Sequence, residues 1–136
     1  MTTMTQARST FQVKGWDEQT SSDVDGHLKI THAVVAFAYS GDVEGDGAMQ
    51  YLMLYRDDGT ATVVGMERIT AQLAGRSGSF VLQHSGSYAD GVASGEFEVV
   101  AGSGSGQLAG LRGRGTAVAH KDGTTQFTLE YDLPAQ

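Results

Sequence analysis

The stretch "VVGMERITAQL" at residues 63–73 is apolar at most positions but carries an acid beside a base. Side chains of a strand alternate between its two faces, so Glu67 shares a face with Val63 and Ile69, while Arg68 lies on the opposite face. Both faces are largely apolar, which is typical of a strand that protein covers on both sides. The stretch therefore predicts a doubly covered strand with one carboxylate on an apolar face.

Similar short apolar segments, separated by turn residues, follow one another along the chain. Linkers such as "RDDGT" and "HKDGTT" contain the Asp and Gly that adopt turn conformations with positive φ. Even spacing of short strands is typical of an all-β barrel or sandwich. The predicted strands cover residues 10–16, 27–40, 49–55, 60–73, 79–89, 95–101, 107–120 and 125–133.

Strands that are apolar on both faces favour a barrel over a sandwich. Residues 33–39 and 63–66 have this pattern, whereas a sandwich covers only one face of each sheet. A barrel with a packed interior and an outer face covered by a neighbouring subunit accounts for both faces. We therefore expect one barrel domain over residues 10–134 that forms a homo-oligomer, a dimer or a trimer, with a flexible tail at residues 1–9.

The composition narrows the range of partners. The chain has 136 residues and no cysteine, and its 9 basic and 16 acidic residues give a net charge of −7. An acidic surface repels phosphate backbones, which argues against a nucleic-acid partner. The longest apolar run, "AVVAFAY", is far shorter than the roughly 20 residues of a membrane helix. The first residues show no secretory signal, so we expect a cytoplasmic protein with no membrane partner.

Three motifs that suggest a cofactor or a metal are better explained structurally. "VVAGSGSGQLAG" at residues 99–110 has the glycines of a dinucleotide loop, but further glycines oppose the helix that such a loop needs. "DVEGDG" at residues 42–47 opens like a calcium loop, yet Met53 stands where a bidentate Glu belongs. The four histidines lack metal-ligand spacing, and His84 is expected on the barrel surface or at an interface. We predict no cofactor and no metal.

Turn geometry decides which residues join Glu67 on its face. A five-residue loop at 74–78 places Val81 and Gln83 beside Glu67. The "RDDGT" turn leaves two alternatives. A two-residue turn puts Gln50, Leu52 and Leu54 on that face, whereas a three-residue loop with a left-handed Gly59 puts Tyr51, Met53 and Tyr55 there. We favour the second, because "DDG" suits a type I turn followed by a left-handed glycine.

An apolar interior face with a single carboxylate is a candidate ligand site. In a low-dielectric interior Glu67 can act as a general acid or base, or as the polar anchor of an apolar pocket. Glu67 is thus the candidate catalytic residue, and the candidate ligand-binding residues are Tyr51, Met53, Tyr55, Val63, Ile69, Val81 and Gln83. The alternative is structural, with Glu67 and Arg68 paired or reaching water at the barrel rim.

Several long motifs resemble one bacterial family of unknown function in the allene oxide cyclase barrel superfamily. They are "GMERITAQLAGRSGSFVLQHSG" (65–86), "VVAGSGSGQLAGLRGRG" (99–115), "SGDVEG" (40–45) and "LEYDL" (129–133), and the similarity covers residues 10–133. Ala101 and Ser105 depart from the family's turn, where Pro and Thr are expected. The resemblance implies an eight-stranded antiparallel up-and-down β-barrel with a lumen, and it implies no established reaction.

The wider superfamily includes plant allene oxide cyclases, and dirigent proteins have a similar barrel. The resemblance to these proteins implies binding of a hydrophobic small molecule. The cyclases use an acid and an Asn on the first strand, where this chain has Gln12 and Lys14, so their chemistry does not transfer. Glu67 remains the candidate acid, with Asp17 and Glu18 as weaker ones.

Three hypotheses for the function follow. The favoured one is a barrel that binds a small lipophilic molecule in its lumen. The second is an isomerase or cyclase in which Glu67 is the general acid or base and Tyr51 or Tyr55 donates a hydrogen bond. The third is a filled barrel that serves in oligomer assembly, its lumen plugged by Phe37, Phe80, Phe97 and Phe127.

Overall fold

The computed structural model describes residues 4–24 and 28–134, and these ranges contain strands and turns but no helix. The strands are β1 (Thr5–Val24), β2 (Leu28–Gly41), β3 (Val43–Arg56), β4 (Ala61–Leu73), β5 (Arg76–Ala89), β6 (Val92–Val99), β7 (Ser105–Gly106), β8 (Arg112–Ala119) and β9 (Thr125–Asp132). No helix in the described part of the chain is long and apolar enough to cross a membrane.

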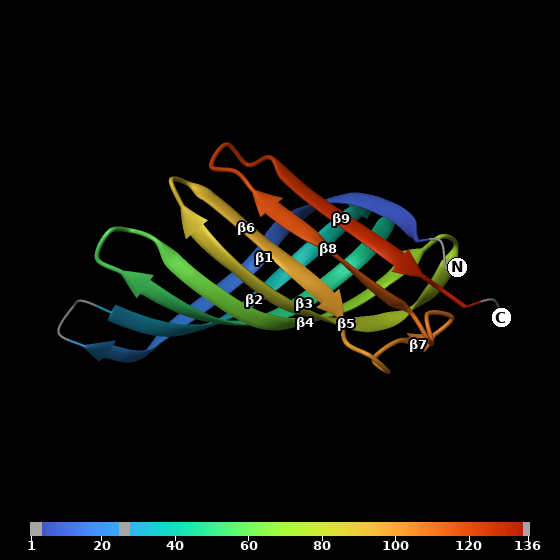
Figure 1. The fold of residues 1–136 in the computed structure, drawn as a ribbon, viewed down its shortest axis with the longest axis horizontal. Coiled ribbons are helices and arrows are strands. Elements are labelled where there is room, and N and C mark those ends of the chain that lie inside the picture. The colour runs from blue at the N-terminus through green and yellow to red at the C-terminus, as the bar shows by residue number, and fades with distance from the viewer. Residues whose placement is uncertain (1–3, 25–27, 135–136) are drawn as a thin grey trace.

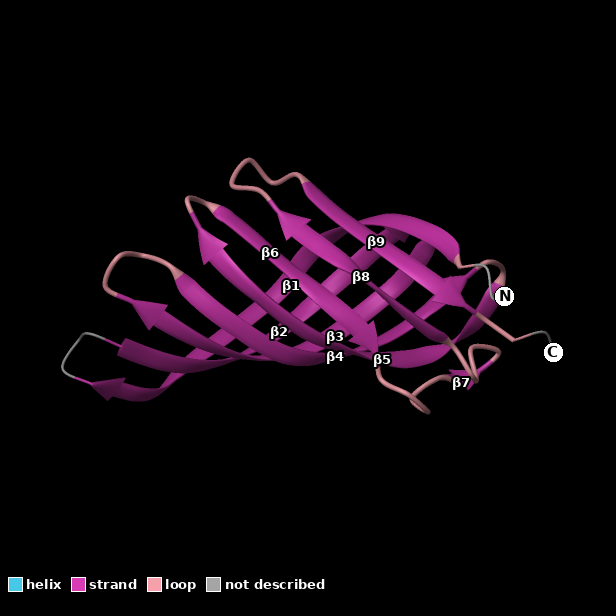
Figure 2. Cartoon of the chain, viewed as in Figure 1, coloured by secondary structure: helices cyan, strands magenta, loops and turns pink. Residues whose placement is uncertain are grey.

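The nine strands form one antiparallel sheet in the order β4-β3-β2-β1-β9-β8-β6-β5-β7. A further pairing between β4 and β5 brings the sheet round on itself, so that it is ring-like (Figure 1). Strands surround the interior, and the loops gather at the two ends of the ring (Figure 2). The expectation of an all-β antiparallel fold is confirmed.

The two ends of the ring differ. The end with the β3–β4, β5–β6 and β8–β9 turns is called the open end here. At the opposite, closed end lie the start of β1, the end of β9 and the β6–β8 connection that contains β7 (Figure 1). That connection sends Leu108 and Leu111 inward, where they are 0% and 1% exposed. It therefore caps the interior at this end.

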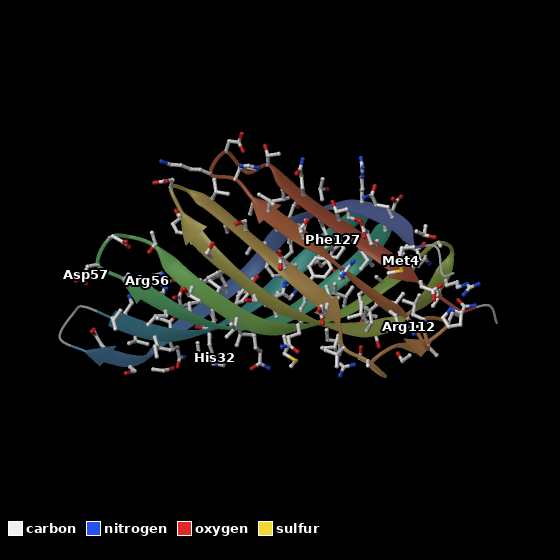
Figure 3. All side chains as sticks on the ribbon, in the orientation of Figure 1. Met4, His32, Arg56, Asp57, Arg112 and Phe127 are labelled. Atoms are coloured by element: carbon white, nitrogen blue, oxygen red, sulfur yellow. The ribbon has the colours of Figure 1, made fainter. Side chains whose placement is uncertain are left out.

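Aromatic rings fill the middle of the ring. Phe97 and Phe127 stack with their centroids 4.8 Å apart, and Tyr39 meets Phe127 edge-on at 5.0 Å. Figure 3 shows Phe127 inside the ring and His32 at its outer side. The four phenylalanines expected to plug the lumen, Phe37, Phe80, Phe97 and Phe127, are all buried. The cavity inside the described part of the ring therefore lies toward the open end.

The β4–β5 turn differs from the predicted five-residue loop. Leu73 pairs with Arg76, so the turn has only two residues, Ala74 and Gly75, with φ of 53° and 77°. Two successive positive φ values are typical of a type I′ turn. The shorter turn reverses the faces of β5, so Val81 and Gln83 lie on the outer face.

The β3–β4 turn is the predicted three-residue loop. The amide of Arg56 donates to the carbonyl of Thr60 at 3.0 Å, and Gly59 is left-handed with a φ of 86°. Because Met49 pairs with Glu67, the odd-numbered residues of β3 share the inner face with it. Tyr51, Met53 and Tyr55 therefore face the interior, as expected.

The predicted flexible tail is wrong for residues 5–9. These residues pair with β9, and the inward-facing Ala7 and Ser9 are 1% and 7% exposed. Small side chains fit the crowded interior there, although the segment reads as polar. Residues 1–3 of the predicted tail lie outside the described residues.

Candidate functional site

A fully buried carboxylate lies at the centre of the interior. Glu67 on β4 is 0% exposed, and both of its oxygens are hydrogen-bonded. The hydroxyl of Tyr39 on β2 donates to Oε2 at 2.5 Å, and Nε2 of His84 on β5 lies 2.8 Å from Oε1. A buried carboxylate without such partners is strongly unfavourable. Arg68 is exposed on the outer face, so the alternative of a rim pair is wrong.

The carboxylate has space because the neighbouring strand carries a glycine. A Cβ added at Gly47 would overlap the carboxylate of Glu67 and stand 2.9 Å from the ring of Tyr39. The φ of Gly47 is not in the left-handed region, so the requirement for glycine here is one of space. In the sequence this glycine reads as an ordinary turn residue of "DVEGDG".

Burial and the charge of Glu67 keep the nearby tyrosines protonated. Burial, followed by the charge of Glu67 and its hydrogen bond, raises the pKa of Tyr39 far above its ordinary value. Burial and the same charge raise the pKa of Tyr51 as well. Both phenols are therefore hydrogen-bond donors at neutral pH, and the Glu67 oxygen that Tyr39 contacts is an acceptor.

A cavity of about 290 Å³ opens above the aromatic layer at the open end. His84 lines it, with a side chain that is 11% exposed and a ring 5.3 Å from that of Phe97. One wall of the cavity is thin, because Gly86 and Gly95, which pair across β5 and β6, have no side chains there. The inward-facing apolar and aromatic residues around it include Phe11, Trp16, Phe37, Tyr51, Met53, Val63, Ala117 and Ala119.

The structure brings only part of the predicted site together. Tyr51, Met53 and Val63 line this cavity. Glu67 lies beneath it, and its contact with the cavity lining runs through His84. The prediction that His84 lies on the surface or at an interface is wrong, because the two-residue β4–β5 turn places it inside.

The remaining predicted residues lie elsewhere. Ile69 is 0% exposed in the packed core, below the cavity. Val81 and Gln83 are on the outer face of β5, where Gln83 is exposed. Tyr55 faces inward but bonds to Glu18, with its hydroxyl 2.7 Å from Oε2. No cluster of three or more potential metal ligands exists among residues 4–24 and 28–134.

Glu18 accepts hydrogen bonds from side chains on the aromatic side of the cavity mouth. Besides the bond from Tyr55, its Oε2 accepts a 2.6 Å bond from the hydroxyl of Thr31. Its Oε1 accepts a 2.9 Å bond from Nε1 of Trp16, whose ring lies 6.2 Å from that of Tyr51. Burial alone would raise the pKa of Glu18, but these hydrogen bonds and the charge of Lys29 outweigh it and lower the pKa.

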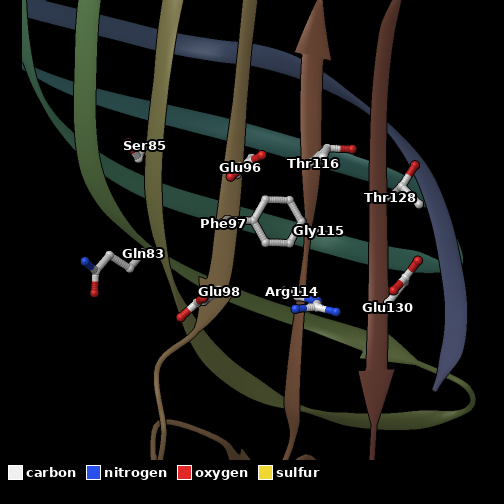
Figure 4. Close-up of a pocket in the computed structure, with 10 residues that line it drawn as sticks. All are labelled: Gln83, Ser85, Glu96, Phe97, Glu98, Arg114, Gly115, Thr116, Thr128 and Glu130. Carbon is white, nitrogen blue, oxygen red and sulfur yellow. The ribbon is translucent and has the colours of Figure 1, made fainter. Parts of the chain in front are cut away.

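A separate hollow of about 640 Å³ lies on the outer face of β5, β6, β8 and β9 (Figure 4). Arg114 stands between Glu98 and Glu130 there, because these three residues are cross-strand neighbours. The ring of Phe97 comes close to this face because Gly115 has no side chain, and a Cβ there would stand 2.7 Å from the ring. The hollow is wide and charged, unlike the apolar cavity inside the ring.

Fold and site together define an all-β protein with a filled, ring-like sheet and a buried acid–histidine pair below an apolar mouth. Residues 7–131 match the family Protein of unknown function (DUF3224), and the chain belongs to that family. A crystal structure of a DUF3224 protein of unknown function from Shewanella oneidensis MR-1 is similar to it, with a TM-score of 0.83 and 27% identity. That match covers 98% of this chain and 99% of the other. No curated protein matches the chain.

Proposed function

We propose that the ring-like sheet is an eight-stranded up-and-down barrel of the allene oxide cyclase type that binds a small apolar molecule at its open end. The observation that carries this proposal is the apolar cavity of about 290 Å³ with His84 at its base. Pockets for small molecules combine a largely apolar lining with a few placed polar groups. This volume suits a ligand with a single ring or with two fused rings.

The expected affinity is modest. A two-ring molecule that loses roughly 200 Å² of apolar surface gains about 5 kcal/mol, which corresponds to a Kd on the order of 100 μM. The aromatic layer below the cavity stops the ligand from going deeper. Trp16 is the chain's single tryptophan and lines the cavity, so its fluorescence reports on occupancy.

The test is a titration of ¹⁵N-labelled protein with 1-methylnaphthalene, followed by amide NMR shifts and Trp16 fluorescence. We expect the shifts to cluster at cavity residues such as Met53 and Val63. Ala117→Leu, which fills the cavity, should abolish them. Ala48→Leu on the exposed outer face of β3 is the matched control and should bind like the wild type. Equal binding by both variants, or no binding by the wild type, would contradict the proposal.

A second candidate function is proton transfer, as in an isomerase or cyclase. The observation that favours it is the chain of hydrogen bonds from Tyr39 through Glu67 to His84. Since Glu67 is fully buried, His84 is the group that can reach a substrate, and Glu67 acts through it as a positioning residue. A histidine oriented by a carboxylate is a common general base.

This candidate is tested by hydrogen–deuterium exchange at the carbon beside the carbonyl of 1-tetralone in D₂O. His84 would take the proton from that carbon, and a solvent deuteron would return to it. Glu67→Gln should slow the exchange by about 100-fold while the binding of 1-tetralone changes little. Exchange at the same rate in wild type, variant and buffer would rule out this activity.

Assembly is a third candidate, favoured by the outer face of β2, β3 and β4. Val34, Leu52, Val64 and Met66 are 47–51% exposed there, and Leu52 pairs with Val64 across the strands. Adjacent large apolar side chains on a surface mark an interaction site. We propose a second copy of the chain as the partner. Light scattering should then show an oligomer that Leu52→Glu dissociates, and a monomeric wild type would refute this.

A further inference from the structure

His84 can present a hydrogen-bond acceptor to the cavity. The Tyr39 hydroxyl donates to Glu67 Oε2, and a histidine bonded to a carboxylate normally carries its proton between the two groups. In that tautomer Nε2 of His84 donates to Glu67 Oε1 across the 2.8 Å contact. The other ring nitrogen, Nδ1, is then unprotonated and accepts hydrogen bonds.

Nδ1 of His84 is accessible. Among the described residues, every fully buried side-chain nitrogen or oxygen has a hydrogen-bond partner. Within the described residues His84 makes its side-chain hydrogen bond through Nε2, so its Nδ1 reaches accessible space. The Phe97 ring, 5.3 Å away at an angle of 53°, fixes the plane of the imidazole. His84 lines both the apolar cavity and a hollow on the outer side of β3, β4 and β5. The proposed binding function assigns the partner of Nδ1 to the cavity.

A hydrogen-bond donor lies in the same row of side chains. Tyr51 and His84 both pair with Gly65, one from each neighbouring strand. The Tyr51 ring leans over that glycine, because a Cβ at Gly65 would stand 2.9 Å from its Cδ1. The Tyr51 phenol stays protonated, because burial and the charge of Glu67 raise its pKa. Tyr51 and His84, which both line the cavity, thus place a donor and an acceptor on either side of Gly65.

We infer that the ligand of this cavity carries a hydroxyl group, as an alcohol, phenol or enol, that donates to Nδ1 of His84 and accepts from Tyr51. The inference rests on the proposed binding function. A hydroxyl is the smallest group that both donates and accepts a hydrogen bond. A carbonyl or ether oxygen would leave Nδ1 without a partner, and leaving a buried polar group unpaired disfavours binding.

The test compares 1-naphthol with 1-methylnaphthalene, which differ by a hydroxyl in place of a methyl group of similar size. We expect 1-naphthol to bind the wild type about tenfold tighter. In His84→Gln the amide can still reach Glu67 Oε1 but offers no atom at the Nδ1 position, so the two ligands should bind equally. Tyr51→Phe, a milder change, should reduce the preference about threefold. Circular dichroism checks that both variants are folded.

Two results would overturn the inference while the proposed function stands. One is equal affinity of the wild type for both ligands. The other is tighter binding of 1-naphthoate than of 1-naphthol, which would mean that His84 meets the ligand as a cation. If neither naphthalene binds, the proposed function and this inference fail together. A preference for 1-naphthol that survives in His84→Gln would also contradict it, since another group would then make the contact.

Discussion

Tyr39→Phe removes one oxygen atom and tests whether the interior holds a charged Glu67. The hydroxyl of Tyr39 donates to Oε2 at 2.5 Å, and Glu67 is 0% exposed, so water cannot replace the lost donor easily. A hydrogen bond to a charged group contributes about 1.5–3 kcal/mol, and an unsatisfied buried charge costs still more. We expect a loss of about 2–3 kcal/mol in the free energy of unfolding, and a fall in Tm of about 10 °C.

The measurement is urea unfolding followed by circular dichroism, with the slope of the transition compared between variants. Tyr131→Phe is the matched control, because Tyr131 is 7% exposed and its hydroxyl makes no hydrogen bond within the described residues. That control should lose less than about 0.5 kcal/mol.

A double-mutant cycle separates charge from packing. In a Glu67→Gln background the acceptor is neutral, so Tyr39→Phe should cost only about 1 kcal/mol. If Tyr39→Phe and Tyr131→Phe cost the same in the wild-type background, the carboxylate is either uncharged or hydrated. The account of the site would then be wrong.

Three further predictions concern single positions. Gly47→Ala should destabilise the protein by about 3 kcal/mol in urea unfolding, because the added methyl group displaces the Glu67 carboxylate; an unchanged midpoint would show that the carboxylate has room to move. Ala74→Gly should stabilise the protein by about 0.5–1 kcal/mol, because Ala74 has a φ of 53°; a lower Tm would contradict this. The pKa of Glu18 is lower in the folded protein than its ordinary value of 4.5. Its contribution to the free energy of unfolding is therefore fully present above 4.5 and is lost as the pH falls through the lower, folded pKa. Glu18→Gln should therefore flatten the stability–pH curve between the folded pKa and 4.5, and parallel curves for variant and wild type would refute the assignment.

The strand pattern and the β3–β4 turn could be predicted because each has a strong local signal. Alternating apolar residues mark the strands, and "DDG" specifies a loop with a left-handed Gly59. A three-residue loop places Tyr51 and Met53 on the inner face through the pairing of β3 with β4. The local chemistry of the turn alone was sufficient to predict these positions.

The faces of β5 could not be predicted, because the sequence of the β4–β5 turn is atypical. A type I′ turn usually contains Asn-Gly or Asp-Gly, whereas Ala74 adopts a left-handed conformation that is unfavourable for alanine. The register of the β4–β5 ladder fixes this turn, and the two turn residues alone do not specify that register. The observed turn is three residues shorter than the predicted loop, and this odd difference places His84 at the site and Gln83 on the outer face.

Bulges in β1 likewise change which side chains face the cavity mouth. The pairing with β2 shifts between Val13 and Gly15, so the inward positions change from odd to even numbers. Trp16 and Glu18 consequently face the interior side. A strict period of two over this segment would place them outside, and bulges of this kind have no reliable sequence signal apart from glycine.

The position of Glu67 in the ring connects stability with the proposed site. Below it, toward the closed end, Phe80 and Leu108 are 0% exposed and the interior is packed. Above it, the cavity wall includes small residues such as Gly95 and Ala117. The carboxylate stands at the boundary, where its desolvation is offset by Tyr39 and its charge reaches the cavity through His84. Packing of the closed half can therefore hold a hydrogen-bonded carboxylate–histidine pair that would be screened by water at the open end.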